Sequence, residues 1–210
     1  MRVTFEEVFG RRFYSFPEPV RALVEASGGA PRVVDLGGHI GLFGLFVLSR
    51  YPGARIASFE PDPANAPILA QCIAQNAPSG NWQLVEACAG TAEGTVAFAG
   101  GLGERSHVAE PDSGGTQVPV IDALPYLEDA VLVKMDIEGA EWALLSDPRF
   151  ARARPPALVL EYHSAGAPMP AEPRRSATDL LEGLGYEVEP IPGTAPSEEV
   201  GMLWAWQPGA

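Results

Sequence analysis

A glycine-rich turn follows a short apolar run in the sequence VVDLGGHIG at 33–41. Asp35 ends the run, Gly37 and Gly38 make the turn, and Gly41 opens the next helix, which leaves backbone N–H groups free at a helix N-terminus. The dinucleotide pattern GxGxxG is not met, because the glycines that should follow Gly37 are absent. The spacing of Asp35, Gly37 and Gly41 instead matches a loop that passes under a sulfonium amino acid, with the acid facing its ammonium group.

A second acidic motif, SFEPD at 58–62, supplies the partner of this loop. Glu60 is expected at the tip of a strand, where its carboxylate can accept hydrogen bonds from both ribose hydroxyls of a nucleoside. Pro61 and Asp62 complete the motif, and Asp62 could equally cap the helix that follows. Together the two motifs predict a site for S-adenosylmethionine.

The end of the third predicted strand should border the adenine ring. Glu86 and Ala87 are the positions expected there, together with Cys88, although Cys88 could equally be a buried core residue. His39, inside the glycine turn, either hydrogen-bonds to cofactor or substrate or is a structural histidine. The sequence leaves open which of these side chains contacts the adenine.

Three ionisable residues near the ends of two neighbouring predicted strands could act on an acceptor. Asp136 follows the run VLVKM and is expected beside the central crevice, where it would also border the cofactor; Glu161 and His163 end the run LVLEYH. A hydroxyl acceptor needs a base to remove its proton, and His163, with an ordinary pKa of about 6.5, is the first candidate. Asp136 or Glu161 would orient it. Alternatively all three only position the substrate, because the sulfonium donor is already reactive and proximity lowers the barrier.

A metal-bound version of this site is the alternative, because Asp136 and Glu161 could share Mg²⁺ with water molecules and align a substrate diol. Two oxygen ligands are few for a metal, so we expect a site without one. Lys134 should share a side of its strand with Asp136, and either pairs with it or packs into the helix layer. Glu138 could cap the following helix or touch ligand, and Glu141 is expected to be a surface or capping acid.

Short β-rich runs alternate with amphipathic stretches from residue 32 onward, which is typical of a parallel sheet covered by helices on both faces. The predicted strands are 32–36, 54–59, 82–87, 130–136, 157–162, 185–191 and 200–206. The predicted helices are 17–27, 41–50, 64–77, 139–146 and 175–184. We therefore expect an α/β fold with a seven-stranded, mostly parallel sheet.

The last two predicted strands are separated only by residues 192–199, too few for a crossover helix, so the last strand must run antiparallel. A doubly wound sheet that ends in this way is expected of class I methyltransferases. A nicotinamide-binding Rossmann domain normally continues with another parallel strand.

Two further runs, at 94–100 and 116–124, have the composition of additional strands. The Gly/Ser-rich stretch 100–115 lies between them and is either a mobile lid or a hairpin tip. Its Ser106 and His107 are weaker candidates for substrate contact.

The charge balance disfavours a nucleic acid partner. The 210 residues include 14 basic and 27 acidic ones, with no basic cluster that would bind a phosphate backbone. A membrane protein is also not expected, because no apolar run approaches the roughly 20 residues that span a bilayer, and the first residues lack a signal-peptide core. Cys72 and Cys88 have neither disulfide-framework nor zinc spacing, which favours reduced thiols in a cytoplasmic protein.

The motifs together resemble the FkbM family of methyltransferases over roughly residues 30–206. The matching pieces are VVDLGGHIGLFGLF, ASFEPDPANAPILAQCIAQN, VEACAGTAEGTVAF, VPVIDAL, VLVKMDIEGAEWALL and LVLEYH, of which KMDIEGAE is the most specific. The resemblance implies a Rossmann-like class I methyltransferase fold, S-adenosylmethionine as donor, and usually O-methylation of a secondary metabolite or glycan hydroxyl. This sequence departs from the family at Gly38 and His39, where an Ala–Asn pair is common.

We therefore expect a methyltransferase domain at 31–210, preceded by an N-terminal helical extension at 1–30, acting on a small-molecule hydroxyl. The alternatives are N-methylation of a small molecule, a nucleotide-cofactor oxidoreductase, and a cofactor-binding module without catalysis. The terminal hairpin and the absence of the GxGxxG pattern disfavour the oxidoreductase. The presence of Asp35, Glu60 and Asp136 disfavours a module without catalysis.

Overall fold

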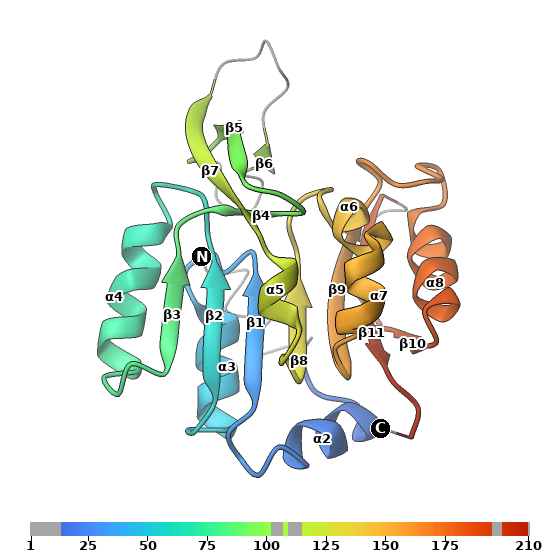
Figure 1. The fold of residues 1–210 in the computed structure, drawn as a ribbon, viewed down its shortest axis with the longest axis horizontal. Coiled ribbons are helices and arrows are strands. Elements are labelled where there is room, and N and C mark those ends of the chain that lie inside the picture. The colour runs from blue at the N-terminus through green and yellow to red at the C-terminus, as the bar shows by residue number, and fades with distance from the viewer. Residues whose placement is uncertain (1–13, 102–106, 109–114, 195–198, 210) are drawn as a thin grey trace.

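The main sheet has seven strands, and its order places the first strand near the middle (Figure 1). The computed structural model describes residues 14–101, 107–108, 115–194 and 199–209. From edge to edge the strands are β10 (Glu187–Pro190), β11 (Val200–Trp206), β9 (Ala157–His163), β8 (Leu132–Met135), β1 (Arg32–Leu36), β2 (Arg55–Phe59) and β3 (Trp82–Val85). All neighbours are parallel except β11, which is antiparallel to β9 and β10. The structure confirms the predicted α/β fold with an antiparallel last strand.

Helices cover both faces of this sheet (Figure 1). One face packs against α2 (Glu18–Glu25), α3 (Leu42–Arg50) and α4 (Ala66–Asn76). The other packs against α5 (Leu124–Leu127), α6 (Glu141–Ser146), α7 (Pro148–Ala153) and α8 (Pro173–Gly183). The sequence did not predict α5 and α7, because each is too short to show a helical period.

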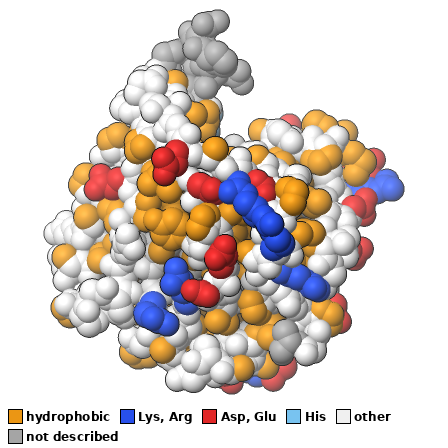
Figure 2. All heavy atoms as spheres, viewed as in Figure 1, with side chains coloured by type: hydrophobic (Ala, Val, Ile, Leu, Met, Phe, Trp, Pro, Cys, Tyr) orange, Lys and Arg blue, Asp and Glu red, His pale blue; other side chains and the backbone are white. Residues whose placement is uncertain are grey.

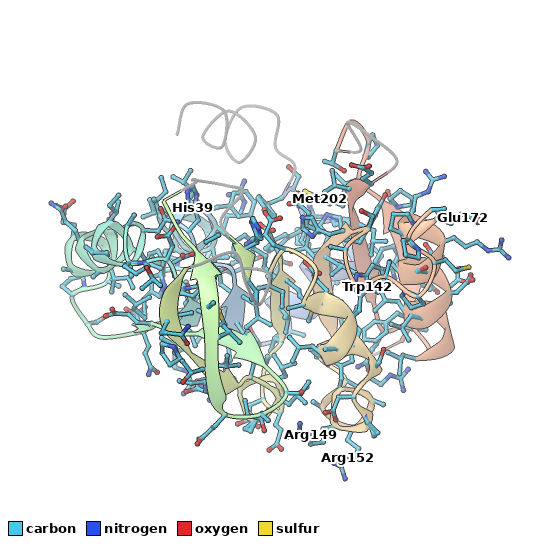
Figure 3. All side chains as sticks on the ribbon, turned by 90° about the horizontal axis from the view of Figure 1, so that it is seen from above. His39, Trp142, Arg149, Arg152, Glu172 and Met202 are labelled. Atoms are coloured by element: carbon cyan, nitrogen blue, oxygen red, sulfur yellow. The ribbon has the colours of Figure 1, made fainter. Side chains whose placement is uncertain are left out.

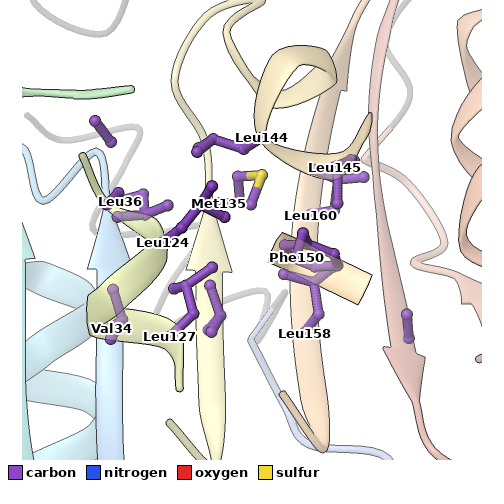
Figure 4. Packing of buried hydrophobic residues seen from close by; sticks show 14 of the residues in the cluster. Val34, Leu36, Leu124, Leu127, Met135, Leu144, Leu145, Phe150, Leu158 and Leu160 are labelled. Carbon is purple, nitrogen blue, oxygen red and sulfur yellow. The ribbon is translucent and has the colours of Figure 1, made fainter. Parts of the chain in front are cut away.

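The central strands are buried on both sides, which explains their nearly continuous apolar sequence. In β1, Val34 and Leu36 point into one core and Val33 into the other. Figure 4 shows Val34 and Leu36 beside Met135 of β8 and Leu124 of α5. All five side chains are fully or nearly fully buried. A shift of β1 by one residue would therefore turn its buried apolar side chains toward the wrong face of the sheet.

A smaller second sheet stands above the carboxyl edge of the main sheet (Figure 1). Its order is β4 (Cys88–Gly90), β7 (Thr116–Asp122), β5 (Gly94–Ala99) and β6 (His107–Val108). The strands predicted within 94–100 and 116–124 are therefore confirmed. Most of the stretch 100–115 lies outside the described residues, and its described part, β6, pairs with β5 as in a hairpin.

The chain before β1 packs onto the main sheet and α3. The ring of Tyr14 meets Phe43 edge-on, with centroids 5.1 Å apart, and Phe16 meets Trp204 of β11 in the same way at 5.5 Å. Val20 of α2 is fully buried in the same core. Residues 1–13 of the predicted extension lie outside the described residues.

The surface seen in Figure 2 mixes hydrophobic, acidic and basic side chains without a broad basic patch. Of the large hydrophobic residues that the structure describes, Ile68 and Val108 are exposed. None of the described helices combines the length and the apolar character needed to cross a membrane.

A buried polar chain fixes the Trp82 ring between α3 and the sheet. Its indole N–H donates to Ser58 Oγ at 2.9 Å, and that hydroxyl donates to Asp35 Oδ2 at 3.0 Å. Gly44 of α3 lies directly against the ring: a Cβ built on Gly44 would lie 2.1 Å from Trp82 Cζ2. The ring cannot move away without breaking its hydrogen bond, so only glycine fits at position 44.

Gly44→Ala should therefore lower the free energy of unfolding by about 1–3 kcal/mol, through overpacking. Gly183→Ala is the matched control, because a Cβ on that residue of α8 meets nothing within 4 Å; it should be neutral or stabilise by up to about 1 kcal/mol. Urea unfolding of both variants measures the difference. A Gly44→Ala variant as stable as Gly183→Ala would contradict the packing described.

Candidate functional site

A cavity of about 620 Å³ lies between the carboxyl edge of the main sheet and the second sheet. The ends of β1, β2, β8 and β9 form one wall, and residues of β4, β5, β6 and β7 form the other. Seen from above this edge, His39 lies over one half of the molecule and Trp142 over the other (Figure 3). The sequence-predicted residues divide in the same way, into a nucleoside end at β1 and β2 and an acceptor end at β8 and β9.

The glycine turn is held close to both neighbouring strands. The N–H groups of Gly37 and Gly38 both donate to Phe59 O of β2. A Cβ on Gly37 would lie 1.9 Å from the Asp136 carbonyl oxygen, and Gly37 has φ of +86°. Only glycine satisfies both conditions. Gly41, at φ +92°, precedes α3 and leaves its first N–H groups without a side-chain cap.

Glu60 lies at the tip of β2 with its carboxylate at the cavity wall. Oε2 accepts the His39 backbone N–H at 2.7 Å, and Oε1 accepts the Asp62 N–H at 2.8 Å. Burial raises the pKa of Glu60 to about 7, although these two N–H groups lower it. A carboxylate can accept about four hydrogen bonds, so Glu60 keeps capacity for further hydroxyl donors.

The neighbours of Glu60 have different roles from one another. Pro61 lines the cavity, but Asp62 does not. The Asp62 carboxylate accepts the N–H groups of Ala64 and Gly101, so it caps the turn before α4 and ties down the end of β5. This is the capping alternative that the sequence left open.

The third predicted strand ends at Val85, two residues early, because the Ala87 N–H turns back to the Val85 carbonyl. Glu86 is exposed and does not line the cavity, so its position gives no support to the predicted cofactor contact. Ala87 and Cys88 do line the cavity. Burial raises the pKa of the Cys88 thiol to about 12, which keeps it protonated.

Lys134 joins the two ends of the site. Its ammonium donates to the Gly37 carbonyl at 2.6 Å and lies 3.2 Å from Asp136 Oδ2 and 3.5 Å from Asp35 Oδ1. Burial lowers the pKa of Lys134, but the Asp136 and Asp35 carboxylates outweigh it and raise that pKa overall. Of the two alternatives left open for Lys134, the structure shows the ion pair with Asp136. Asp35 is fully buried behind the glycine turn and is not part of the cavity wall.

His163 is held by carboxylates on both sides of its ring. Nδ1 lies 2.9 Å from Glu141 Oε1, and Nε2 lies 3.5 Å from Glu138 Oε2. Burial lowers the pKa of His163, but the hydrogen bond and charge of Glu141, with Asp136 and Glu138, raise it to about 9. With this pKa the ring already carries its proton at neutral pH and cannot accept another. This disfavours the general base role that the sequence predicted for His163.

Of the two alternatives for Glu141, the structure contradicts the surface acid. Glu141 is fully buried, and its two oxygens accept the N–H groups of Ile137 and Gly139 in the turn before the helix, as a capping acid does. The helix begins only at Glu141, and Glu138 lies in the preceding turn with φ of +55°. Glu138 lines the cavity and does not cap the helix.

Glu161 lines the cavity beside Asp136. Burial and the charge of Asp136 raise the pKa of Glu161 to about 8. Asp136, Glu161 and His163 each offer one ligand atom, and these three atoms lie within 4.8 Å of one another. The structure thus brings together the three residues singled out for the acceptor end.

The wall that faces these carboxylates is largely apolar and comes from the second sheet. The residues of this sheet that line it are Val96, Phe98, His107, Val108 and Val120. Ser106 lies outside the described residues. The sequence analysis predicted strands here but not that their apolar side chains meet in one wall, because this depends on the pairing of β5, β6 and β7.

Tyr14 also lines the cavity and was missed by the sequence reasoning. It precedes α2, far from every motif, and is 8% exposed. Burial raises its pKa, so its hydroxyl is a neutral hydrogen-bond donor. No local pattern marks a residue that reaches the site only by packing on α3.

Comparison with known proteins places this geometry in a family. The model of the FkbM methyltransferase domain matches residues 35–188, which includes both ends of the cavity. The chain belongs to the FkbM methyltransferase family. Methyltransferase sdnD of Sordaria araneosa is 44% identical over 46 residues, which are 22% of this chain and 18% of that protein. The matched part is therefore less than a fifth of that relative.

Solved structures share the fold of this FkbM chain. EvdMO1 superposes with a TM-score of 0.51 at 22% identity, over 90% of this chain and 40% of that one. The N-terminal domain of EvdMO1 with SAH bound gives 0.51 at 21%, over 90% and 79%. Fibrillarin of Aeropyrum pernix, in complex with S-adenosyl-L-methionine, gives 0.51 at 14%, over 88% and 73%. These likenesses confirm the Rossmann-like methyltransferase fold.

The buried Glu60 should make stability depend on pH. Its pKa is about 7 in the folded chain and ordinary, near 4.5, when unfolded. Between pH 4.5 and 7 the Glu60 side chain is ionised in the unfolded chain but protonated in the folded one. The free energy of unfolding therefore falls as pH rises, by about 1.4 kcal/mol for each unit of pKa shift. Glu60→Gln should lack this contribution. Urea unfolding of both proteins at pH 5 and pH 8 checks it, and parallel pH profiles would contradict it.

Proposed function

We propose that the chain transfers the methyl group of S-adenosylmethionine to a hydroxyl oxygen of a small molecule, a metabolite or a sugar. The observation that carries this proposal is one cavity with two different ends. At one end the buried Glu60 carboxylate can accept hydrogen bonds from hydroxyl groups. At the other end the side chains of Asp136 and Glu161 lie close together.

The nucleoside end suits S-adenosylmethionine. Glu60 would accept both ribose hydroxyls, while the His39 and Asp62 N–H groups hold its carboxylate in place. Ala87 and Cys88 would border the adenine, and the turn at Gly37 and Gly38 would pass under the amino acid part. Fibrillarin and the EvdMO1 domain, which share the fold, contain S-adenosylmethionine or SAH in their structures, which supports this reading.

The acceptor end suits a partly apolar molecule with a hydroxyl group. Val96, Phe98 and Val120 would contact its apolar part, and the carboxylates at β8 and β9 would face its hydroxyl. An amine acceptor needs no added base once neutral, so the group of carboxylates favours a hydroxyl over a nitrogen. N-methylation is the second candidate within the same cavity.

The transfer is an in-line displacement. A lone pair of the acceptor oxygen forms the new bond to the methyl carbon as the carbon–sulfur bond breaks, and its electron pair stays on sulfur to give S-adenosylhomocysteine. The hydroxyl proton passes to a carboxylate of the acceptor end, because His163 is already protonated. Lys134 holds Asp136 against the glycine turn, which fixes the distance between donor and acceptor ends.

Incubation of the protein with metabolite extracts and S-adenosylmethionine labelled with ¹³C in its methyl group tests this function. We expect a labelled product whose carbon NMR shift identifies a methyl ether. A labelled N-methyl group would support the second candidate. Binding of S-adenosylmethionine without any labelled product would indicate a module without catalysis, and binding of NAD(H) alone would indicate an oxidoreductase.

Glu60→Gln should weaken S-adenosylmethionine binding by about 1–3 kcal/mol at pH 8, because a neutral amide replaces the charged acceptor of the ribose hydroxyls. The wild-type affinity should fall as pH drops below 7, where Glu60 becomes protonated. Glu86→Gln is the matched control, since that exposed side chain lies outside the cavity. Calorimetric titration measures all three proteins; equal affinity of Glu60→Gln and wild type would refute the assignment.

A further inference from the structure

We propose that Asp136, Glu161 and His163 bind a small divalent cation, Mg²⁺ or Mn²⁺, at the acceptor end of the cavity. The role of the cation rests on the proposed function, because the cation would hold the acceptor hydroxyl. The binding of the cation can be tested without that function. It reverses the expectation from the sequence, which counted two oxygen ligands and therefore favoured a site without metal.

The spacing of the three groups suits one cation. Their ligand atoms lie within 4.8 Å of one another, and bonds of about 2.0–2.6 Å from a central ion would join them. Asp136 follows β8, whereas Glu161 and His163 end the neighbouring strand β9, so the backbone of the sheet fixes their relative positions. Two carboxylate oxygens and one imidazole leave coordination positions for water and for a substrate oxygen.

His163 is oriented as a metal-ligating histidine is. Its Nδ1 is paired with Glu141 at 2.9 Å, and Glu141 is fully buried and fixed by the N–H groups of Ile137 and Gly139. Histidine ligands of metals almost always donate their other N–H to a carboxylate in this way. Nε2 is therefore the nitrogen available to the cation, and it lies 3.5 Å from Glu138 Oε2. Trp142, labelled in Figure 3, holds the end of β9 by donating to the His163 carbonyl.

The charges of this end also favour a cation. Asp136, Glu138 and Glu161 all line the same part of the cavity. The Lys134 ammonium is already shared between Asp136 and the buried Asp35. A divalent cation would offset the negative charge that remains where these side chains converge.

The cation would supply Lewis acidity: it would bind the acceptor oxygen beside the donor methyl group and make its hydroxyl easier to deprotonate. With Asp136 and Glu161 engaged as ligands, Glu138 is the carboxylate at the cavity wall that can take the hydroxyl proton. The acceptor oxygen then attacks the methyl carbon, and the carbon–sulfur electron pair leaves with sulfur.

Titration of the full chain with Mn²⁺, followed by electron paramagnetic resonance, tests the site without S-adenosylmethionine or acceptor. We expect wild type to bind one Mn²⁺ per chain in competition with Mg²⁺. Asp136→Asn and Glu161→Gln should each bind at least about tenfold more weakly, and Glu141→Gln about 10–100-fold more weakly, as for other residues that orient a ligand. Glu138→Gln should keep Mn²⁺ and lose methyl transfer.

Asp129→Asn is the matched control for Asp136→Asn, because Asp129 is an exposed acid that precedes β8 at the opposite edge of the sheet. It should bind Mn²⁺ as wild type does, and circular dichroism identifies any variant that fails to fold. Glu161→Gln, which keeps the shape of the side chain, decides the question if Asp136→Asn is unfolded. The proposal is overturned if wild type takes up no Mn²⁺ saturably at millimolar concentration, or if Glu161→Gln binds it like wild type. Either result would overturn the metal site without deciding whether the chain transfers a methyl group, because the labelled methyl-transfer experiment tests that separately.

Discussion

The buried ammonium of Lys134, the sole lysine of the chain, is the contact on which the site depends. It donates to the Gly37 carbonyl and lies between Asp35 and Asp136, so one cation joins the glycine turn to the tip of β8. Breaking a buried pair of this kind leaves an uncompensated charge, which is far more costly than the loss of a surface ion pair. The nucleoside and acceptor ends therefore cannot move apart without exposing or protonating Asp35.

The sequence predicted the features that local patterns encode. Alternating apolar runs predicted the strands of the main sheet, and the short final connection predicted the antiparallel β11. The position of Glu60 at a strand tip, and the need for glycine at Gly37, followed from turn chemistry alone. These features require only near neighbours in the chain, which is why a single sequence was sufficient for them.

Features that depend on distant contacts could not be predicted. The pKa of His163 is raised by the hydrogen bond and charge of Glu141 and by the charges of Asp136 and Glu138. These groups approach the ring only when β9 packs beside the end of β8 and the turn after it. Glu86 follows a strand that ended two residues early, so its side chain faces solvent and not the cavity. Tyr14 reaches the cavity by packing on α3, with no motif to mark it.

A crystal structure of the chain with S-adenosylhomocysteine would test the two-ended cavity most directly. The account predicts that both ribose hydroxyls donate to the Glu60 carboxylate and that the sulfur points toward Asp136 and Glu161. A nucleoside bound away from Glu60, or a sulfur directed away from the ends of β8 and β9, would contradict it.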